Sequence, residues 1–113
     1  MPTLRLPFLR KPLTGLAIGL TGLGASAATL EVHIRDYAFL PAELVVQVGD
    51  TVRWTNDEKR TSHSVVLLID GQAQESERFF PEESWSHVFD RPGRIEYRCG
   101  PHPEMRGAIV VRP

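Results

Sequence analysis

Cysteine is almost absent from this sequence, because Cys99 is the only one among 113 residues. A single cysteine excludes an internal disulfide, so the thiol is left for an intermolecular bridge, for chemical reactivity or for binding a metal ion. Methionine is nearly as scarce, since Met105 is the only one besides Met1. Any sulfur chemistry of the chain beyond its first residue therefore involves Cys99 and Met105.

Long apolar runs are also lacking, apart from one near the N-terminus. Residues 1–27 read as a secretory signal peptide with a basic start (Arg5, Arg10 and Lys11), an apolar run over residues 13–25 and an A-x-A cleavage site at Ala25-Ser26-Ala27. The alternative is a membrane anchor, but the run is shorter than the roughly 20 apolar residues of a membrane span. We expect export to the periplasm or the cell exterior, with no stable membrane insertion after cleavage.

Basic residues are too few for a nucleic-acid-binding protein. The remaining residues, 28–113, suffice for one small domain. Without the three basic residues of the signal, 10 basic side chains oppose 14 acidic ones, a net charge of −4 with neutral histidines. A nucleic-acid-binding domain shows a basic patch, so we expect no such partner.

Residues 28–113 carry the pattern of an all-β fold. Apolar residues alternate in short segments, as in Leu44, Val46 and Val48, and no apolar pattern of 3.6-residue period reaches the length of a helix. The polar stretch 70–83 is expected to be a loop with at most one helical turn. Short strands between turn residues predict a β-sandwich or barrel. The expected strands are 31–35, 43–48, 51–55, 65–69, 84–89, a strand ending at Cys99, and 108–111.

Three metal-ligand residue types recur at every third position of one short segment: Cys99, His102 and Met105. A tight loop with this spacing can turn all three side chains toward one point. Pro101 and Pro103 stiffen the loop, so the ligands are presented with little ordering cost. Because thiolate and thioether favour Cu(I) and imidazole suits copper in either state, the loop predicts a copper site.

A trigonal site of two His and one Cys with a weak axial Met is the blue-copper electron-transfer arrangement. The loop supplies only one of the two imidazoles, and we expect the other from His63, which the fold must bring in. We expect His87 to be half-buried at the edge of the core and His33 to be solvated. Zinc is disfavoured because its structural and catalytic sites do not use Met.

The sequence resembles the cupredoxins, the type I blue-copper family of plastocyanin, pseudoazurin and amicyanin. The resemblance covers nearly all of residues 28–113, and the Cys-x₂-His-x₂-Met spacing is similar to the short loop of amicyanin. One departure is Ser64, where relatives often have an Asn that ties the ligand loops together. The backbone N–H of Ser64 can still reach the Cys99 sulfur. The matching segments are Phe39-Leu40-Pro41, Gly49-Asp50, His63-Ser64-Val65, Pro92-Gly93 and 99–107.

This resemblance implies a Greek-key β-sandwich with one type I copper ion near one end, held by His63, Cys99, His102 and, weakly, Met105. It also implies a monomeric, non-enzymatic carrier of single electrons between redox proteins, such as a c-type cytochrome or a dehydrogenase. The alternative is a copper carrier that delivers the ion itself, although such proteins usually use exposed sites rich in Met and His. A copper enzyme of this fold needs further copper sites, and the sequence has no second His cluster.

Overall fold

The computed structural model of this protein describes residues 26–113, so the predicted signal peptide lies outside the described residues except for its last two. The described chain consists of strands and turns, and it contains no helix that is long and apolar enough to span a membrane. The strands are β2 (Thr29–Arg35), β3 (Ala38–Leu40), β4 (Glu43–Gln47), β5 (Thr51–Asn56), β6 (Val66–Ile69), β7 (Gln72–Glu75), β8 (Ser84–Val88), β9 (Gly93–Arg98) and β10 (Arg106–Arg112).

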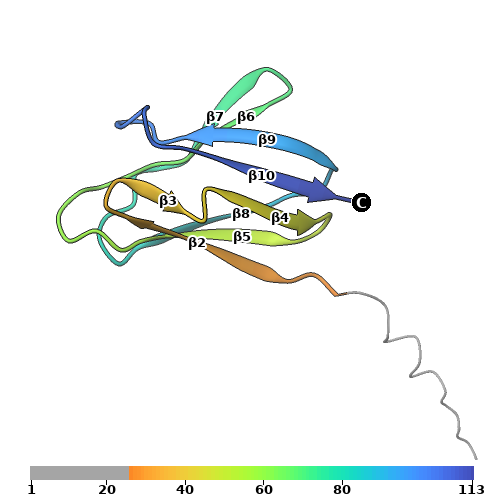
Figure 1. Ribbon diagram of the computed structural model, residues 1–113, viewed down its shortest axis with the longest axis horizontal. Helices are drawn as coiled ribbons and strands as arrows, with labels where there is room; N and C mark the ends of the chain where they lie inside the picture. Colours follow the sequence, from red (N-terminus) through yellow and green to blue (C-terminus); the bar gives the residue numbers. More distant parts are fainter. Residues whose placement is uncertain (1–25) are drawn as a thin grey trace, which may run out of the picture.

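The strands form two sheets that pack face to face (Figure 1). One sheet has the order β4-β10-β9-β6-β7 and the other β3-β2-β5-β8. The pairs β4–β10 and β2–β5 are parallel, whereas the other neighbouring pairs are antiparallel. The expected all-β sandwich is confirmed.

The segment 70–83 corrects one expectation. It contains no helical turn, because residues 72–75 form β7, which pairs with β6 in a hairpin with Val66 opposite Glu75. All four side chains of β7 are exposed, since the strand lies at the edge of its sheet and covers no core. A strand without a buried face lacks the apolar alternation by which strands are recognised in a sequence.

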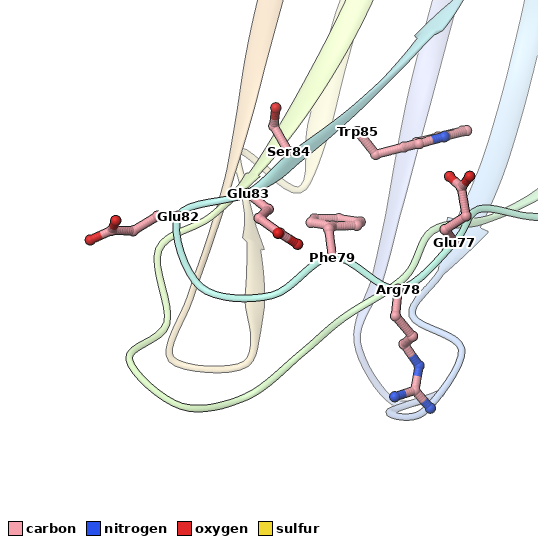
Figure 2. Close-up of a pocket in the computed structure, with 7 residues that line it drawn as sticks. All are labelled: Glu77, Arg78, Phe79, Glu82, Glu83, Ser84 and Trp85. Carbon is pink, nitrogen blue, oxygen red and sulfur yellow. The ribbon is translucent and has the colours of Figure 1, made fainter.

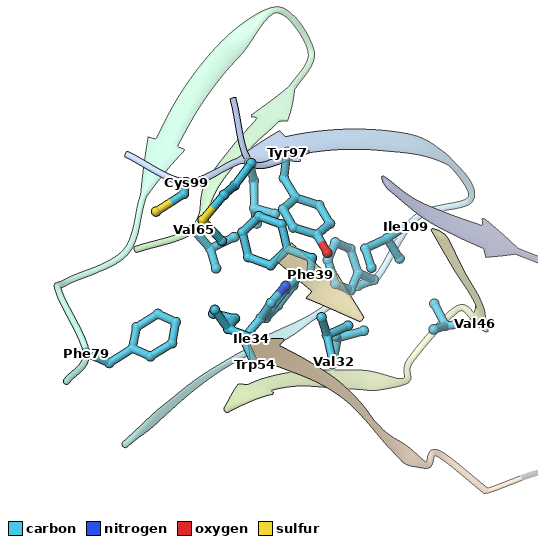
Figure 3. Packing of buried hydrophobic residues seen from close by; sticks show 14 of the residues in the cluster. Val32, Ile34, Phe39, Val46, Trp54, Val65, Phe79, Tyr97, Cys99 and Ile109 are labelled. Atoms are coloured by element: carbon cyan, nitrogen blue, oxygen red, sulfur yellow. The ribbon is translucent and has the colours of Figure 1, made fainter. Parts of the chain in front are cut away.

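The core lies between the two sheets and is rich in aromatic rings (Figure 3). Trp54 of β5 is fully buried, and its ring lies 5.3 Å from that of Tyr97 on β9, centroid to centroid. Phe39 of β3 packs edge-on against the same tyrosine at 4.7 Å. These contacts join the sheets, and buried aromatic side chains contribute strongly to such a core.

The strand pairing decides which loops meet at one end of the sandwich. Because β6 and β9 are antiparallel, with Val66 opposite Arg98, the start of β6 lies beside the end of β9. His63 comes just before β6, and Cys99 comes directly after β9. The chain then turns through residues 99–105 into β10, and the β2–β3 turn lies at the same end of the molecule, on the left in Figure 1.

Candidate metal centre

Three potential ligands meet at this end of the sandwich. The sulfur of Cys99 lies 3.5 Å from Nδ1 of His63 and 3.6 Å from Nδ1 of His102. One ligand atom from each of the three residues lies within 4.8 Å of the other two. Cys99 and His63 are fully buried, whereas His102 is partly exposed. The fold thus brings His63 and Cys99, which are 36 positions apart in the chain, into contact.

Backbone hydrogen bonds close the loop that carries Cys99 and His102. The N–H of Cys99 donates to the carbonyl of Met105 at 3.0 Å, and the N–H of Met105 donates to the carbonyl of His102 at 2.9 Å. Met105 is buried in the same apolar cluster as Cys99. The loop is therefore held at both ends, and all three of its sequence-predicted site residues belong to one compact turn.

His63 is held by a short β-bridge to Phe79. The N–H of His63 donates to the carbonyl of Phe79 at 3.1 Å, and the N–H of Phe79 donates back at 2.9 Å. The buried side-chain amide of Asn56 donates to the same Phe79 carbonyl and to that of Thr61, which orders the approach to His63. The position of His63 is therefore set by tertiary contacts rather than by its own strand.

Tyr37 packs edge-on against both imidazoles, with ring centroids 5.8 Å from His63 and 4.9 Å from His102. It lies at the tip of the β2–β3 hairpin, where Asp36 and Tyr37 both have positive φ, 53° and 57°. Two-residue turns of this kind prefer Asn, Asp or Gly, and a bulky residue with positive φ is unusual. Backbone strain of this kind is found mainly at functional sites, and here it occurs at the residue whose ring packs against both imidazoles.

Glu58 joins Tyr37 to the buried histidine. Its Oε2 accepts the backbone N–H of Tyr37 at 2.8 Å and lies 3.5 Å from Nε2 of His63. The second distance is longer than a well-formed hydrogen bond. Sequence reasoning did not single out Tyr37 or Glu58, because only the three-dimensional contact with the histidines marks them.

Burial sets the protonation of the two buried ligands. Burial, followed by the neighbouring imidazole of His102, lowers the pKa of His63, so His63 is held in the neutral form that binds metals. Burial raises the pKa of the Cys99 thiol, and this is opposed by hydrogen bonds from the backbone N–H groups of Ser64 and His102. The thiol therefore keeps its proton until a metal ion displaces it.

The donor set fits a copper ion. A first-row metal bound at about 2.3 Å to sulfur and about 2.0 Å to imidazole nitrogen separates those atoms by about 3.5 Å, close to the two distances from Cys99. One thiol, two imidazoles and a nearby thioether are soft or borderline ligands, which copper prefers over Mg²⁺ or Ca²⁺. No carboxylate belongs to the cluster found in the described residues.

The other two histidines lie elsewhere. His87 on β8 is partly buried between the rings of Trp85 and Phe89, at centroid distances of 5.7 and 4.8 Å. His33 is exposed, and its Nδ1 lies 2.8 Å from an Asp57 carboxylate oxygen. Both occupy the environments expected for them, and neither belongs to the cluster around Cys99.

A separate hollow lies between the β7–β8 connection and β8 (Figure 2). Phe79 and Trp85 give it an apolar part, while its rim carries both signs of charge. None of the three clustered ligands lines it, so we assign it no role in the metal centre. Its lining residues are Glu77, Arg78, Phe79, Glu82, Glu83, Ser84 and Trp85.

Comparisons with known proteins also point to copper. The family described as "Copper binding proteins, plastocyanin/azurin family" matches residues 26–112. The chain is 37% identical over 82 residues to amicyanin of Paracoccus denitrificans, covering 71% of this chain and 63% of that protein. It is 30% identical over 88 residues to amicyanin of Paracoccus versutus, covering 75% and 66%. The chain thus spans slightly less than two thirds of the length of these relatives.

Solved structures of amicyanin have the same fold. The reduced Cu(I) form at pH 4 of an amicyanin mutant matches with a TM-score of 0.70 and 34% identity, covering 80% of this chain and 88% of that chain. An oxidized amicyanin mutant matches with a TM-score of 0.69 and 34% identity, covering 74% and 81%.

Proposed function

Because the chain belongs to the plastocyanin/azurin family of copper-binding proteins, we propose that it carries single electrons between redox proteins and is not an enzyme. The observation that supports this most directly is the meeting of the only cysteine with two imidazoles in a buried place. When bound, copper supplies a one-electron Cu(II)/Cu(I) couple. The ligands we assign are His63, Cys99 and His102, with Met105 as a weak fourth.

The chain holds these ligands in a nearly constant arrangement. Backbone hydrogen bonds close the loop 99–105, the β-bridge holds His63, and Tyr37 packs against both imidazoles. Burial of the thiol and of His63 keeps water away. A site that moves little when its charge changes needs little reorganisation, which suits rapid electron transfer.

His102 is the proposed point of electron exit and entry. It is the only partly exposed member of the cluster in the described chain, and it lies between Pro101 and Pro103 with the exposed ring of Tyr37 beside it. At this partly exposed imidazole a partner protein can approach the proposed metal centre more closely than at the buried His63 or Cys99. We propose a redox-protein partner here, such as a c-type cytochrome or a dehydrogenase.

The remaining parts of the proposal follow from the sequence. Residues 1–27 act as a signal peptide, residues 28–113 form the single copper-binding domain, and the mature protein works as a monomer in the periplasm or outside the cell. Mass determination of the secreted protein and its elution volume on a sizing column test these points.

Stopped-flow mixing separates an electron carrier from a copper carrier. The copper-loaded, reduced protein is mixed with an oxidised c-type cytochrome, and haem reduction is followed together with return of the blue absorption. An electron carrier reduces the haem and keeps its copper. Loss of copper to a Cu(I) chelator or an apo-protein acceptor, without electron transfer to any redox partner tested, contradicts the proposal.

Copper is expected to stabilise the fold. A ligand that binds only the native state adds about 4 kcal/mol when its concentration is 1,000 times Kd. For a domain of this size, that corresponds to a rise in Tm of about 15 to 30 °C. Thermal unfolding with and without one equivalent of Cu(II) measures the effect, and equal Tm values contradict it.

A further inference from the structure

Two hydrogen bonds connect the two ligand-bearing segments beside the metal centre. The N–H of Gly100 donates to Oγ of Ser64 at 3.1 Å, and the Ser64 hydroxyl donates to Oε2 of Glu75 at 2.8 Å. An ionised carboxylate only accepts, so Glu75 takes the one hydroxyl proton and leaves a lone pair of Ser64 for Gly100. The Gly100 N–H can only donate, so Glu75 acts by fixing where the Ser64 hydroxyl proton points, which leaves the Ser64 oxygen free to accept from Gly100.

These hydrogen bonds act on residues adjacent to the proposed ligands. Ser64 directly follows His63, and Gly100 directly follows Cys99. Ser64 is fully buried, and its backbone N–H also bonds the Cys99 sulfur. A shift of Ser64 therefore changes both the separation of the two segments and a hydrogen bond to the thiol.

The absence of a side chain at Gly100 makes room for this arrangement. A Cβ at this position would overlap Oε2 of Glu75 and Oγ of Ser64. The backbone of Gly100 does not lie in the left-handed region, so neighbouring side chains, rather than φ, require glycine here.

The β6–β7 hairpin brings Glu75 to this place. Glu75 lies opposite Val66 in the register, and the next residue, Ser76, exchanges two hydrogen bonds with Val65. The N–H of Val65 donates to Oγ of Ser76 at 2.9 Å, and the N–H of Ser76 donates to the Val65 carbonyl at 2.9 Å. The edge strand is thus fixed against the segment that carries His63 and Ser64.

We propose that Glu75 is a positioning residue for the metal centre: it orients the Ser64 hydroxyl to accept the Gly100 N–H and thereby joins the His63 and Cys99 segments. This inference rests on the proposed function, because it takes Cys99 as the copper ligand. The hydrogen-bonding part concerns the chain alone and is tested separately. Ser64 thus replaces the expected Asn tie with a hydroxyl that depends on a carboxylate from another strand.

The first experiment measures amide hydrogen exchange of Gly100 in the copper-free, full-length mature protein, with the Ile109 amide as an internal reference. We expect Glu75→Ala and Ser64→Ala each to raise Gly100 exchange several-fold relative to Ile109. The double variant should exchange the Gly100 amide only slightly faster than Ser64→Ala alone, because the effects of two residues that act through one another are not additive. Glu75→Gln keeps an acceptor oxygen for the Ser64 hydroxyl, so its Gly100 exchange rate should remain close to that of the wild type.

The second experiment measures the reduction potential of the copper-loaded variants. Glu75→Ala and Glu75→Gln lose the same charge, but only the alanine variant loses the acceptor for the Ser64 hydroxyl. The difference between their reduction potentials therefore measures the effect of positioning Ser64, separate from the effect of charge. Hydrogen bonds to the sulfur favour the electron-rich reduced site and tune its potential. We expect the potential of Glu75→Ala to lie below that of Glu75→Gln, and that of Ser64→Ala to lie below wild type.

Glu77→Ala is the matched control, since it removes a nearby carboxylate that takes no part in these hydrogen bonds; it should leave Gly100 exchange unchanged. Unchanged Gly100 exchange in both Glu75→Ala and Ser64→Ala overturns the proposal whether or not the protein binds copper. Equal potentials for Glu75→Ala and Glu75→Gln overturn the effect on the metal centre. A protein that shows the exchange effect but binds no copper refutes the proposed function instead.

Discussion

Replacing Cys99 with serine is expected to abolish the blue thiolate-to-copper absorption completely. Cys99 is the only cysteine in the chain, so no other thiolate can take its place. Serine is smaller and its hydroxyl is not deprotonated by copper as a thiol is. The measurement is the visible spectrum after addition of one equivalent of Cu(II) to the purified mature protein.

Met105→Leu is a suitable control for this experiment. It keeps the volume of a buried apolar side chain while removing the thioether, and such swaps usually cost less than about 1.5 kcal/mol. Because the axial Met is a weak ligand, the variant should stay blue with a changed potential. A Cys99→Ser protein that folds and keeps the absorption shows that copper binds elsewhere.

Replacing His63 with alanine is expected to weaken copper binding by more than about 100-fold. Loss of a group that only supports a ligand already costs 10- to 100-fold, so loss of a ligand should cost more. The effect should match that of His102→Ala, since the two Nδ1 atoms lie at nearly equal distances from the Cys99 sulfur. Titration with Cu(II) against a competing chelator measures the change.

His87→Ala provides the matched comparison. His87 is also partly buried and packs against aromatic rings, but it belongs to β8 of the other sheet. It should change stability modestly and leave copper affinity unchanged. If His87→Ala loses the site and His63→Ala keeps it, the ligand assignment is wrong.

Two strands, β3 and β7, were not predicted from the sequence, and the β7 segment shows the physical reason for its own case. Strands such as β5 alternate buried and exposed residues, because one face covers the core, and that alternation is visible in the sequence. In β7 all side chains are exposed. Its pairing with β6 depends on backbone hydrogen bonds, which any residue except proline can make. Glu75 could therefore not be connected to the metal centre from its position in the chain.

Local spacing in the sequence determined the ligand loop. Cys99, His102 and Met105 are so close along the chain that a single turn must group them, and the two prolines limit its conformations. The all-β class was equally readable, because alternation with a period of two records directly which side chains face the core. His63 was expected from its residue type and from the resemblance.

Only the tertiary structure decided what surrounds these ligands. The antiparallel pairing of β6 with β9 places His63 against Cys99, the hairpin tip places Tyr37 against both imidazoles, and β7 places Glu75 beside Ser64. Each contact joins residues that are distant along the chain. Such contacts depend on sheet register and side-chain packing, which arise only when the whole core assembles and leave no periodic signal in the sequence.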